Sequence, residues 1–171
     1  MGAAVKGNSM VEERGGWFVV NVRDARWARN EEFGSICRLE PADAPFPQVG
    51  INIFVLERGK PNCRYHREEA QEDLLVLSGR CLEIVNGEER TLETWDFVHF
   101  PAGVTHVVVG LDEPCAVLFV GYRDDPERLF YPASELARRY GAEAPEPTPD
   151  PAVAYADVKK RELVASPRWP L

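Results

Sequence analysis

The chain has 171 residues, of which 44% are apolar, so it is long enough for one domain with a single substantial core. Its formal net charge of -8 argues against a nucleic-acid partner, because contact with a phosphate backbone requires a basic surface. A membrane-spanning helix needs about 20 consecutive apolar residues, and the sequence has no such run. The four cysteines stand singly and no secretion signal is recognisable, so we expect reduced thiols and a cytoplasmic protein.

Taken in chain order, the predicted elements are mostly short β-strands. Asn86-Gly87 lies between two of them and is a strong signal for a two-residue hairpin. Short strands at regular spacing, separated by turn residues, predict an all-β fold, either an antiparallel sandwich or a barrel. Apolar and β-branched runs predict these strands over residues 17–22, 35–39, 51–57, 63–68, 73–77, 80–85, 88–92, 97–100, 104–110 and 115–122.

The C-terminal part has a different composition. Residues 133–140 have helical propensity, with Ser134 as the expected N-cap and Gly141 as the expected end of the helix. Residues 143–151 are acidic and rich in proline, which predicts an extended segment. Residues 153–163 again favour a helix.

These elements predict a division of the chain into three parts. We expect a flexible segment over 1–16, a barrel domain over 17–132, and a short helix with a Pro-rich tail over 133–171 that packs on the barrel or on a partner subunit. Either the strand at 17–22 or the tail around Trp169 is suited to complete the sheet of a neighbour. The prediction is therefore a homodimer.

Four side chains with metal-binding chemistry lie within the series of strands: His66, Glu68, Glu72 and His106. Residues i and i+2 of a strand point to the same face, so His66 and Glu68 project together. Glu72 begins the next strand after a tight turn, and His106 lies early in a later strand. A barrel brings such strand ends to one opening. Two imidazoles with one or two carboxylates suit a divalent ion such as Mn, Fe, Zn or Ni and leave coordination positions for water or substrate.

The spacing of these residues resembles the two sequence motifs of the cupin superfamily, as found in small single-domain microbial cupins. The first motif consists of a glycine, two histidines, a glutamate and a glycine, and the matching positions here are Gly59, His66, Glu68, Glu72 and Gly79. The second consists of a glycine, a proline, a glycine, a histidine and an asparagine, and the matching positions are Trp95, Pro101, Gly103, His106 and Gly110. The resemblance implies a cupin double-stranded β-helix, or jelly-roll barrel, followed by a short helical segment and an extended tail.

Three positions depart from the cupin motifs. Glu68 stands where the second histidine usually lies, Trp95 replaces the opening glycine of the second motif, and Gly110 replaces its closing asparagine. Two imidazoles and two carboxylates would neutralise a divalent ion, which makes it a weaker Lewis acid and favours Mn or Fe(II). Alternatively, Glu72 hydrogen-bonds to a ligand while His66, Glu68 and His106 form a triad of two histidines and one carboxylate.

A substrate pocket is expected next to this metal site. Arg64 precedes His66 by two residues and is placed to bind a substrate carboxylate or phosphate, although a surface role fits equally well. Cys63 lies three residues before His66 and can approach it. The residues expected to line the pocket are Arg64, Leu74, Val76, His99 and Val108.

Three functional hypotheses follow from the resemblance. The first is a metal-dependent enzyme of the dioxygenase or isomerase type that acts on a small molecule, and thus in one form an oxidoreductase. The second is a non-catalytic cupin that binds or senses a small molecule at its metal. The third is a barrel that keeps the fold without the metal. No nucleic acid or membrane is expected as a partner in any of them.

Overall fold

The computed structural model describes residues 11–12, 17–112, 114–123 and 128–168. Most of the segment 1–16, expected to be flexible, and Trp169, expected to contact a partner, lie outside the described residues. Among the described residues, no helix has the length and apolar character required to cross a membrane.

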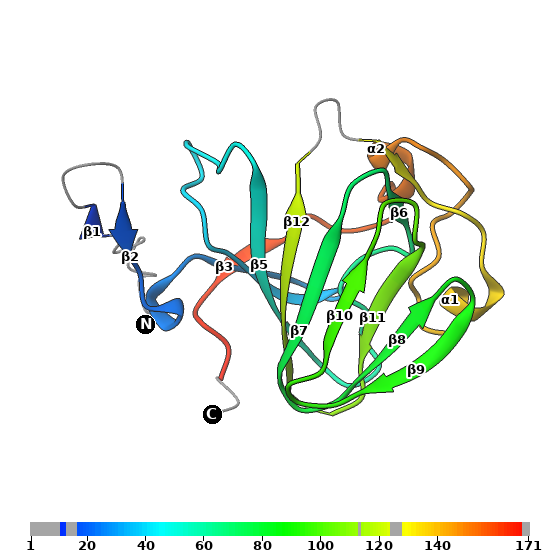
Figure 1. The fold of residues 1–171 in the computed structure, drawn as a ribbon, viewed down its shortest axis with the longest axis horizontal. Coiled ribbons are helices and arrows are strands. Elements are labelled where there is room, and N and C mark those ends of the chain that lie inside the picture. Colours follow the sequence, from blue (N-terminus) through cyan, green and yellow to red (C-terminus); the bar gives the residue numbers. More distant parts are fainter. Residues whose placement is uncertain (1–10, 13–16, 113, 124–127, 169–171) are drawn as a thin grey trace.

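The largest element of the fold is an antiparallel sheet with the strand order β10-β7-β12-β5-β4-β3-β14. It forms the left and central part of the molecule in Figure 1. Its strands are β3 (Trp27–Asn30), β4 (Gly34–Arg38), β5 (Val49–Leu56), β7 (Glu72–Ser78), β10 (Phe97–Phe100), β12 (Cys115–Tyr122) and β14 (Glu162–Val164).

A second, smaller sheet faces the large one. Its order is β11-β8-β9, with β8 (Cys81–Val85), β9 (Glu88–Leu92) and β11 (His106–Gly110). The hairpin between β8 and β9 turns at Asn86 and Gly87, both of which have a positive φ, as the sequence predicts. The remaining elements are β1 (Val11–Glu12), β2 (Phe18–Val19), a 3-10 turn (Val22–Asp24), β6 (Arg67–Glu68), β13 (Leu129–Phe130), α1 (Glu135–Arg138) and α2 (Pro151–Ala154).

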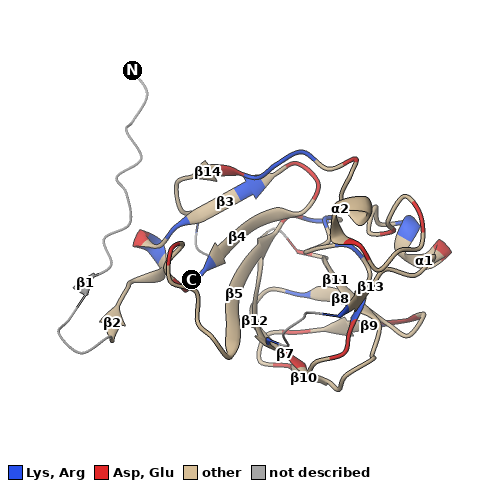
Figure 2. Ribbon diagram, turned by 90° about the horizontal axis from the view of Figure 1, so that it is seen from above, with Lys and Arg blue, Asp and Glu red and all other residues tan. Residues whose placement is uncertain are grey.

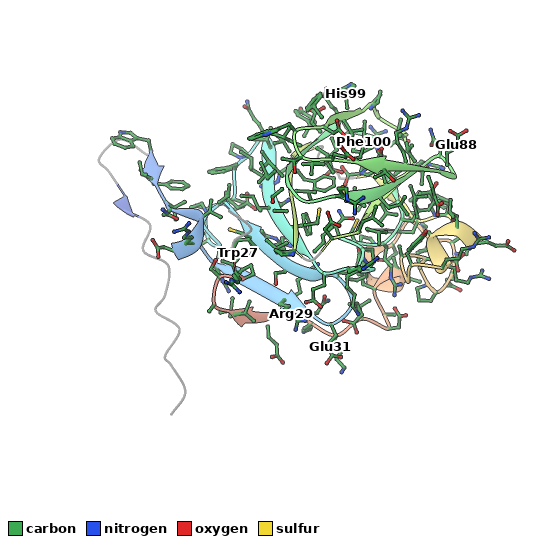
Figure 3. All side chains as sticks on the ribbon, turned by 90° about the horizontal axis from the view of Figure 1, so that it is seen from below. Trp27, Arg29, Glu31, Glu88, His99 and Phe100 are labelled. Atoms are coloured by element: carbon green, nitrogen blue, oxygen red, sulfur yellow. The ribbon has the colours of Figure 1, made fainter. Side chains whose placement is uncertain are left out.

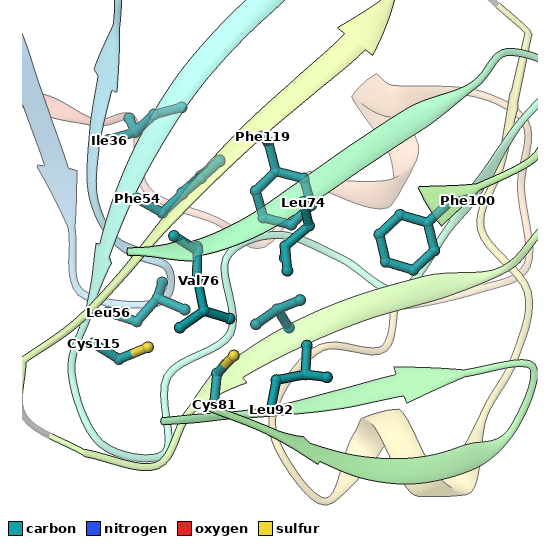
Figure 4. Close-up of a cluster of buried hydrophobic side chains, with 12 residues drawn as sticks. Ile36, Phe54, Leu56, Leu74, Val76, Cys81, Leu92, Phe100, Cys115 and Phe119 are labelled. Atoms are coloured by element: carbon teal, nitrogen blue, oxygen red, sulfur yellow. The ribbon is translucent and has the colours of Figure 1, made fainter. Parts of the chain in front are cut away.

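The main core lies between the two sheets (Figure 4). Alternate residues of each strand point into it, which is the period of two that a sheet with one buried face requires. The large sheet contributes Leu74, Val76 and Phe119, and the small sheet contributes Cys81 and Val108. The outer face of the small sheet is covered by α1, through Ala137. Two facing antiparallel sheets with this core form the predicted jelly-roll β-barrel.

Most barrel strands from β4 to β12 agree with the sequence prediction, but the strand expected at 63–68 is limited to Arg67–Glu68, with His66 joined to His106 by an isolated bridge. Segments outside the barrel strands also differ. The strand expected at 17–22 is only Phe18–Val19, because the Asn21 side chain accepts a hydrogen bond from the Arg23 amide and caps a 3-10 turn. The helix expected at 153–163 is limited to Pro151–Ala154, and Glu162–Val164 instead forms a strand that pairs with β3. Neither β3 nor β14 alternates clearly enough in sequence to be predicted.

Helix α1 begins and ends where the sequence predicts. The Ser134 hydroxyl accepts a hydrogen bond from the Ala137 amide at 3.1 Å, which caps the first turn. Gly141 has a φ of 70° and follows the last turn. The helix is shorter than the predicted range of 133–140.

Candidate metal centre

Strand pairing places His66 directly opposite His106. The chain from Pro61 to His66 runs antiparallel beside β11, and the Asn62 amide donates to the Val108 carbonyl at 2.9 Å. His66 and His106 exchange both backbone hydrogen bonds, at 3.2 and 2.8 Å. Directly opposed residues of an antiparallel pair point to the same face. The two imidazole centroids are accordingly 5.1 Å apart.

Each imidazole is held by a carbonyl two residues before it in the chain. His66 Nδ1 lies 2.9 Å from the Arg64 carbonyl oxygen, and His106 Nδ1 lies 3.1 Å from the Val104 carbonyl oxygen. Because a carbonyl only accepts, each Nδ1 is the protonated nitrogen that donates. Each Nε2 can then offer its lone pair to a cation, which is the usual arrangement for a ligand histidine.

Both Nε2 atoms face carboxylates. His106 Nε2 lies 2.8 Å from Glu72 Oε2, and His66 Nε2 lies 3.2 Å from Glu68 Oε1. A lone pair that faces a carboxylate oxygen needs a proton or a cation between the two atoms. One ligand atom each of His66, Glu72 and His106 lies within 4.8 Å of the other two.

This donor set fits a divalent metal ion, because two neutral imidazoles and one carboxylate are ligands for Fe, Mn, Ni and Zn. The fourth predicted ligand, Glu68, contacts His66 but stands outside the group of three. The structure therefore brings Glu72, rather than Glu68, together with both imidazoles. The alternative triad of His66, Glu68 and His106 is not the one that this geometry assembles.

The two histidines are buried among aromatic rings. His66 is 8% exposed and His106 is 2% exposed. Phe100 stacks on His106 with the ring centroids 4.0 Å apart, and Tyr131 stacks on His66 at 5.8 Å. Removal of water from this site strengthens the attraction between an ion and its carboxylate.

The pKa of His66 is raised well above its usual value. Burial alone would lower this pKa, but Cys63, Glu68 and Glu72 together more than offset that effect. The Cys63 sulfur is 3.7 Å from His66 Nδ1, so the expected approach of this thiol to the site is present. Without a metal ion, Cys63 and the two carboxylates therefore favour a proton on His66.

Three of the predicted pocket residues belong to the main core beneath the histidines. Leu74, Val76 and Val108 are at most 1% exposed and pack in the same cluster as Phe100. Since Phe100 also stacks on His106, this cluster forms an apolar wall next to the metal centre.

The other two predicted pocket residues do not face the metal centre. The Arg64 guanidinium donates to the carbonyls of Gly141, Glu143 and Ala154 and pairs with Asp157. Its role is thus to fasten the C-terminal segment to the barrel. His99 is on the exposed side of β10, where it contacts Asp73 at 2.7 Å, while the adjacent Phe100 points inward (Figure 3).

Sequence reasoning missed one charged residue inside the barrel. Glu83 is 2% exposed, and its Oε1 atom has no hydrogen-bond partner among the described residues. Burial raises the pKa of this carboxyl, and His106 acts in the opposite direction. The indicator was its place in β8, where Cys81, Glu83 and Val85 alternate onto the core face.

Comparison with known proteins agrees with this architecture. Residues 52–121 match the family model described as "Cupin domain". Among curated proteins, none matches this sequence.

Three solved structures illustrate the similarity. A putative sugar phosphate isomerase from Acidithiobacillus ferrooxidans shares 25% identity over 56% of this chain and 64% of its own, with a TM-score of 0.50. A sugar phosphate isomerase of the cupin superfamily from Silicibacter pomeroyi shares 30% identity over 57% of this chain and 64% of its own, with a TM-score of 0.51. A polyketide cyclase from Streptomyces resistomycificus shares the fold at 17% identity over 62% of this chain and 79% of its own, with a TM-score of 0.53.

The match extends over less than two thirds of the length of both sugar phosphate isomerases. The family model covers the strands that carry the candidate metal centre and both ligand histidines. Residues 52–121 of this chain therefore form a cupin domain.

Proposed function

We propose that this protein is a metal-dependent cupin that isomerises a small molecule. The observation that carries the proposal is the orientation of both imidazoles, whose Nδ1 atoms donate to backbone carbonyls while their Nε2 atoms face carboxylates. His66, Glu72 and His106 would hold the ion. A bound divalent ion supplies Lewis-acid polarisation of a substrate oxygen.

Glu68 has a separate role in this proposal. Isomerisation moves a proton between neighbouring carbon atoms and needs a group that accepts it and returns it. The Glu68 carboxylate lies beside His66, outside the three clustered ligands, and is 17% exposed at its side chain. It is therefore placed to exchange a proton with a molecule at the ion. Two similar structures that are named sugar phosphate isomerases support the choice of this reaction class.

Two other functions use the same residues. Two histidines and one carboxylate also suit Fe(II) and oxygen chemistry, so a dioxygenase is the second catalytic candidate. A protein that only binds or senses a small molecule would keep the ion without turnover. A fold likeness alone does not separate these functions.

The first experiment is metal analysis of the protein purified without added metal, followed by assays of sugar phosphate isomerisation and of oxygen consumption. We expect one divalent ion per chain and isomerase turnover. Turnover that consumes oxygen would favour the dioxygenase, and a tightly held ion without either activity would favour the binding protein.

The matched variant for this experiment is His106→Ala. It removes one ligand at a position where the backbone hydrogen bonds to His66 remain available. We expect loss of the ion with retention of the β-rich circular dichroism spectrum. A variant that keeps one ion per chain would refute the ligand assignment.

A further inference from the structure

A cavity of about 620 Å³ is lined by four arginines: Arg26, Arg38, Arg123 and Arg161. Glu40 is the acidic residue in its lining. This concentration of positive charge is unexpected in a chain with a formal net charge of -8. Figure 2 shows a basic residue at the end of β4, where Arg38 lies.

The charges of this cavity are only partly neutralised. Arg123 pairs with Glu40 at 2.7 Å and also donates to the Phe46 carbonyl. Arg161 donates to the carbonyls of Gly34 and Asn62, which are uncharged. Burial lowers the pKa of Arg161, as expected for a cation that is removed from water and has no ion pair within the described part of the chain.

Arg38 is the arginine best placed to bind a ligand. It is exposed at the end of β4 and makes no hydrogen bond or ion pair with a described residue, although it lies close enough to Glu40 and Arg161 to influence their pKa values. Among the described residues, the donors of its guanidinium therefore have no partner.

The cavity belongs to the same face of the large sheet as the core and the metal centre. Ile36, which lines the cavity, also packs in the main core with Leu74 and Phe100. Arg38 follows Ile36 by two residues in β4 and therefore points to the same face. Asn52 is paired with Arg38 and lies on that face as well.

Two glycines separate the arginines from the metal centre. Gly121 pairs with Glu72 on one side and with Gly50 on the other, so the three residues form a row across β7, β12 and β5. A Cβ atom at Gly121 would lie 3.5 Å from Glu72 Oε1, and one at Gly50 would lie 3.5 Å from Arg123 Nη2. Paired residues project to the same face about 5 Å apart. The Glu72 carboxylate and the Arg123 guanidinium thus flank a stretch of sheet that has no side chains.

We propose that Arg38 and Arg123, with Arg161 behind them, bind the anionic group, a phosphate ester or a carboxylate, of the small molecule that reaches the metal centre. Guanidinium groups bind both anions through paired, charge-assisted hydrogen bonds. Glu72 and Gly50 are two strand spacings apart, roughly 10 Å. A molecule of a few carbon atoms spans this distance between its anionic group and its reacting carbons.

The link between this anion site and the reaction rests on the proposed function, so the test measures anion binding without any catalytic readout. Inorganic phosphate and acetate are titrated separately into the full chain by calorimetry at constant ionic strength, without added metal. The test variant is Arg38→Gln. The control is Arg58→Gln, another exposed arginine for which no hydrogen bond or ion pair is found among the described residues.

We expect saturable binding of at least one of the two anions, weakened about tenfold in Arg38→Gln, since a hydrogen bond to a charged group is lost. Binding should be unchanged in Arg58→Gln and in His106→Ala. Tighter binding of phosphate supports a phosphate ester, and tighter binding of acetate supports a carboxylate.

Three results would overturn the anion site: no saturable binding of either anion, unchanged binding in Arg38→Gln, or loss of binding in His106→Ala, which would place the anion at the histidines instead. Equal melting temperatures of the variants exclude misfolding as the cause. A protein that contains no divalent ion but still binds the anion would refute the proposed function and support the arginine site.

Discussion

At the scale of single residues, the two ligand histidines owe their orientation to the backbone. Each ring is fixed by the carbonyl two residues earlier, and the pairing of His66 with His106 sets the distance between the rings. Pre-oriented ligands lose little freedom when an ion binds. The carboxylates then differ in role, because Glu72 joins both imidazoles and Glu68 contacts one.

This difference predicts unequal effects of two matched substitutions. Glu72→Gln removes a ligand and should weaken metal binding by about 100-fold or more, whereas Glu68→Gln should weaken it by about tenfold, the lower end of the effect of a residue that contacts a ligand. Competition with a chromophoric chelator measures both affinities. An equal or larger loss in Glu68→Gln would show that Glu68 is a direct ligand.

The raised pKa of His66 predicts a pH-dependent metal affinity. Metal binding must displace the proton that Cys63 and the neighbouring carboxylates favour on this ring. The affinity should therefore rise with pH, by about tenfold per unit for one displaced proton, until the pH passes the raised pKa. In the metal-free protein the stability of the fold should instead fall as the pH rises. A raised folded-state pKa stabilises the fold below the unfolded value of about 6.5, and this stabilisation is lost as the pH rises through the folded-state pKa.

Chelator competition and thermal melts between pH 6 and 8 test both signs together. The metal-free protein should melt at a lower temperature at the higher pH. The affinity for the metal ion should be greater at the higher pH. A metal affinity that does not change over this range would contradict the protonation of His66.

At the scale of elements, two motif departures have structural explanations. A Cβ atom at Gly110 would lie 2.5 Å from the Glu57 carbonyl oxygen, so only glycine fits where β11 ends beside the loop after β5. Trp95 stands in the turn between β9 and β10 at a φ of 75°, the left-handed region that favours the glycine of the motif. Its amide still donates to the Val76 carbonyl at 2.8 Å.

The conformation of Trp95 predicts a stabilising substitution. Its side chain is 72% exposed, so Trp95→Gly gives up little buried area while it relieves the left-handed strain. We expect the free energy of unfolding to rise by about 1 kcal/mol. Trp95→Ala is the control, because alanine retains the strain. Urea denaturation of both variants measures the free energy of unfolding. A destabilised Trp95→Gly would mean that the indole contributes a contact that outweighs the strain.

The contacts of Arg64 predict how much stability is lost when the C-terminal segment is detached from the barrel. Its side chain is buried, and its donors satisfy three carbonyls around α1 and α2 and the Asp157 carboxylate. Arg64→Met should destabilise the fold by about 3 kcal/mol, because these acceptors lose a charged partner. Hydrogen exchange should increase mainly in residues 133–164. Arg67→Met, which removes a cation above the Phe130 ring, is the control and should leave that segment protected.

At the scale of the whole molecule, exposed apolar side chains suggest where copies of the chain meet. Trp17 and Val19 are more than half exposed on either side of Phe18 in β2. We therefore retain the predicted homodimer through this strand, and light scattering of the purified protein should give the mass of two chains. A mass of one chain for both the unaltered protein and Trp17→Ser would contradict the dimer.

The cytoplasmic location and the division at residues 17 and 132 also stay predictions.

The sequence by itself determined the barrel and the identity of the candidate ligands. Alternating apolar residues and turn residues are local properties of the sequence, and they predict the strands. The histidines at 66 and 106 fall on the motif positions. Helix α1 was predicted in the same way, from its cap.

Only the tertiary structure decided which carboxylate joins the imidazoles and that Arg64 holds the C-terminal segment. It also decided that Glu83 is buried in the barrel and that arginines distant in the chain line one cavity. These features depend on the register between strands far apart in the chain. Strand register is set by the packing of one sheet against another, and no local pattern of residues specifies it.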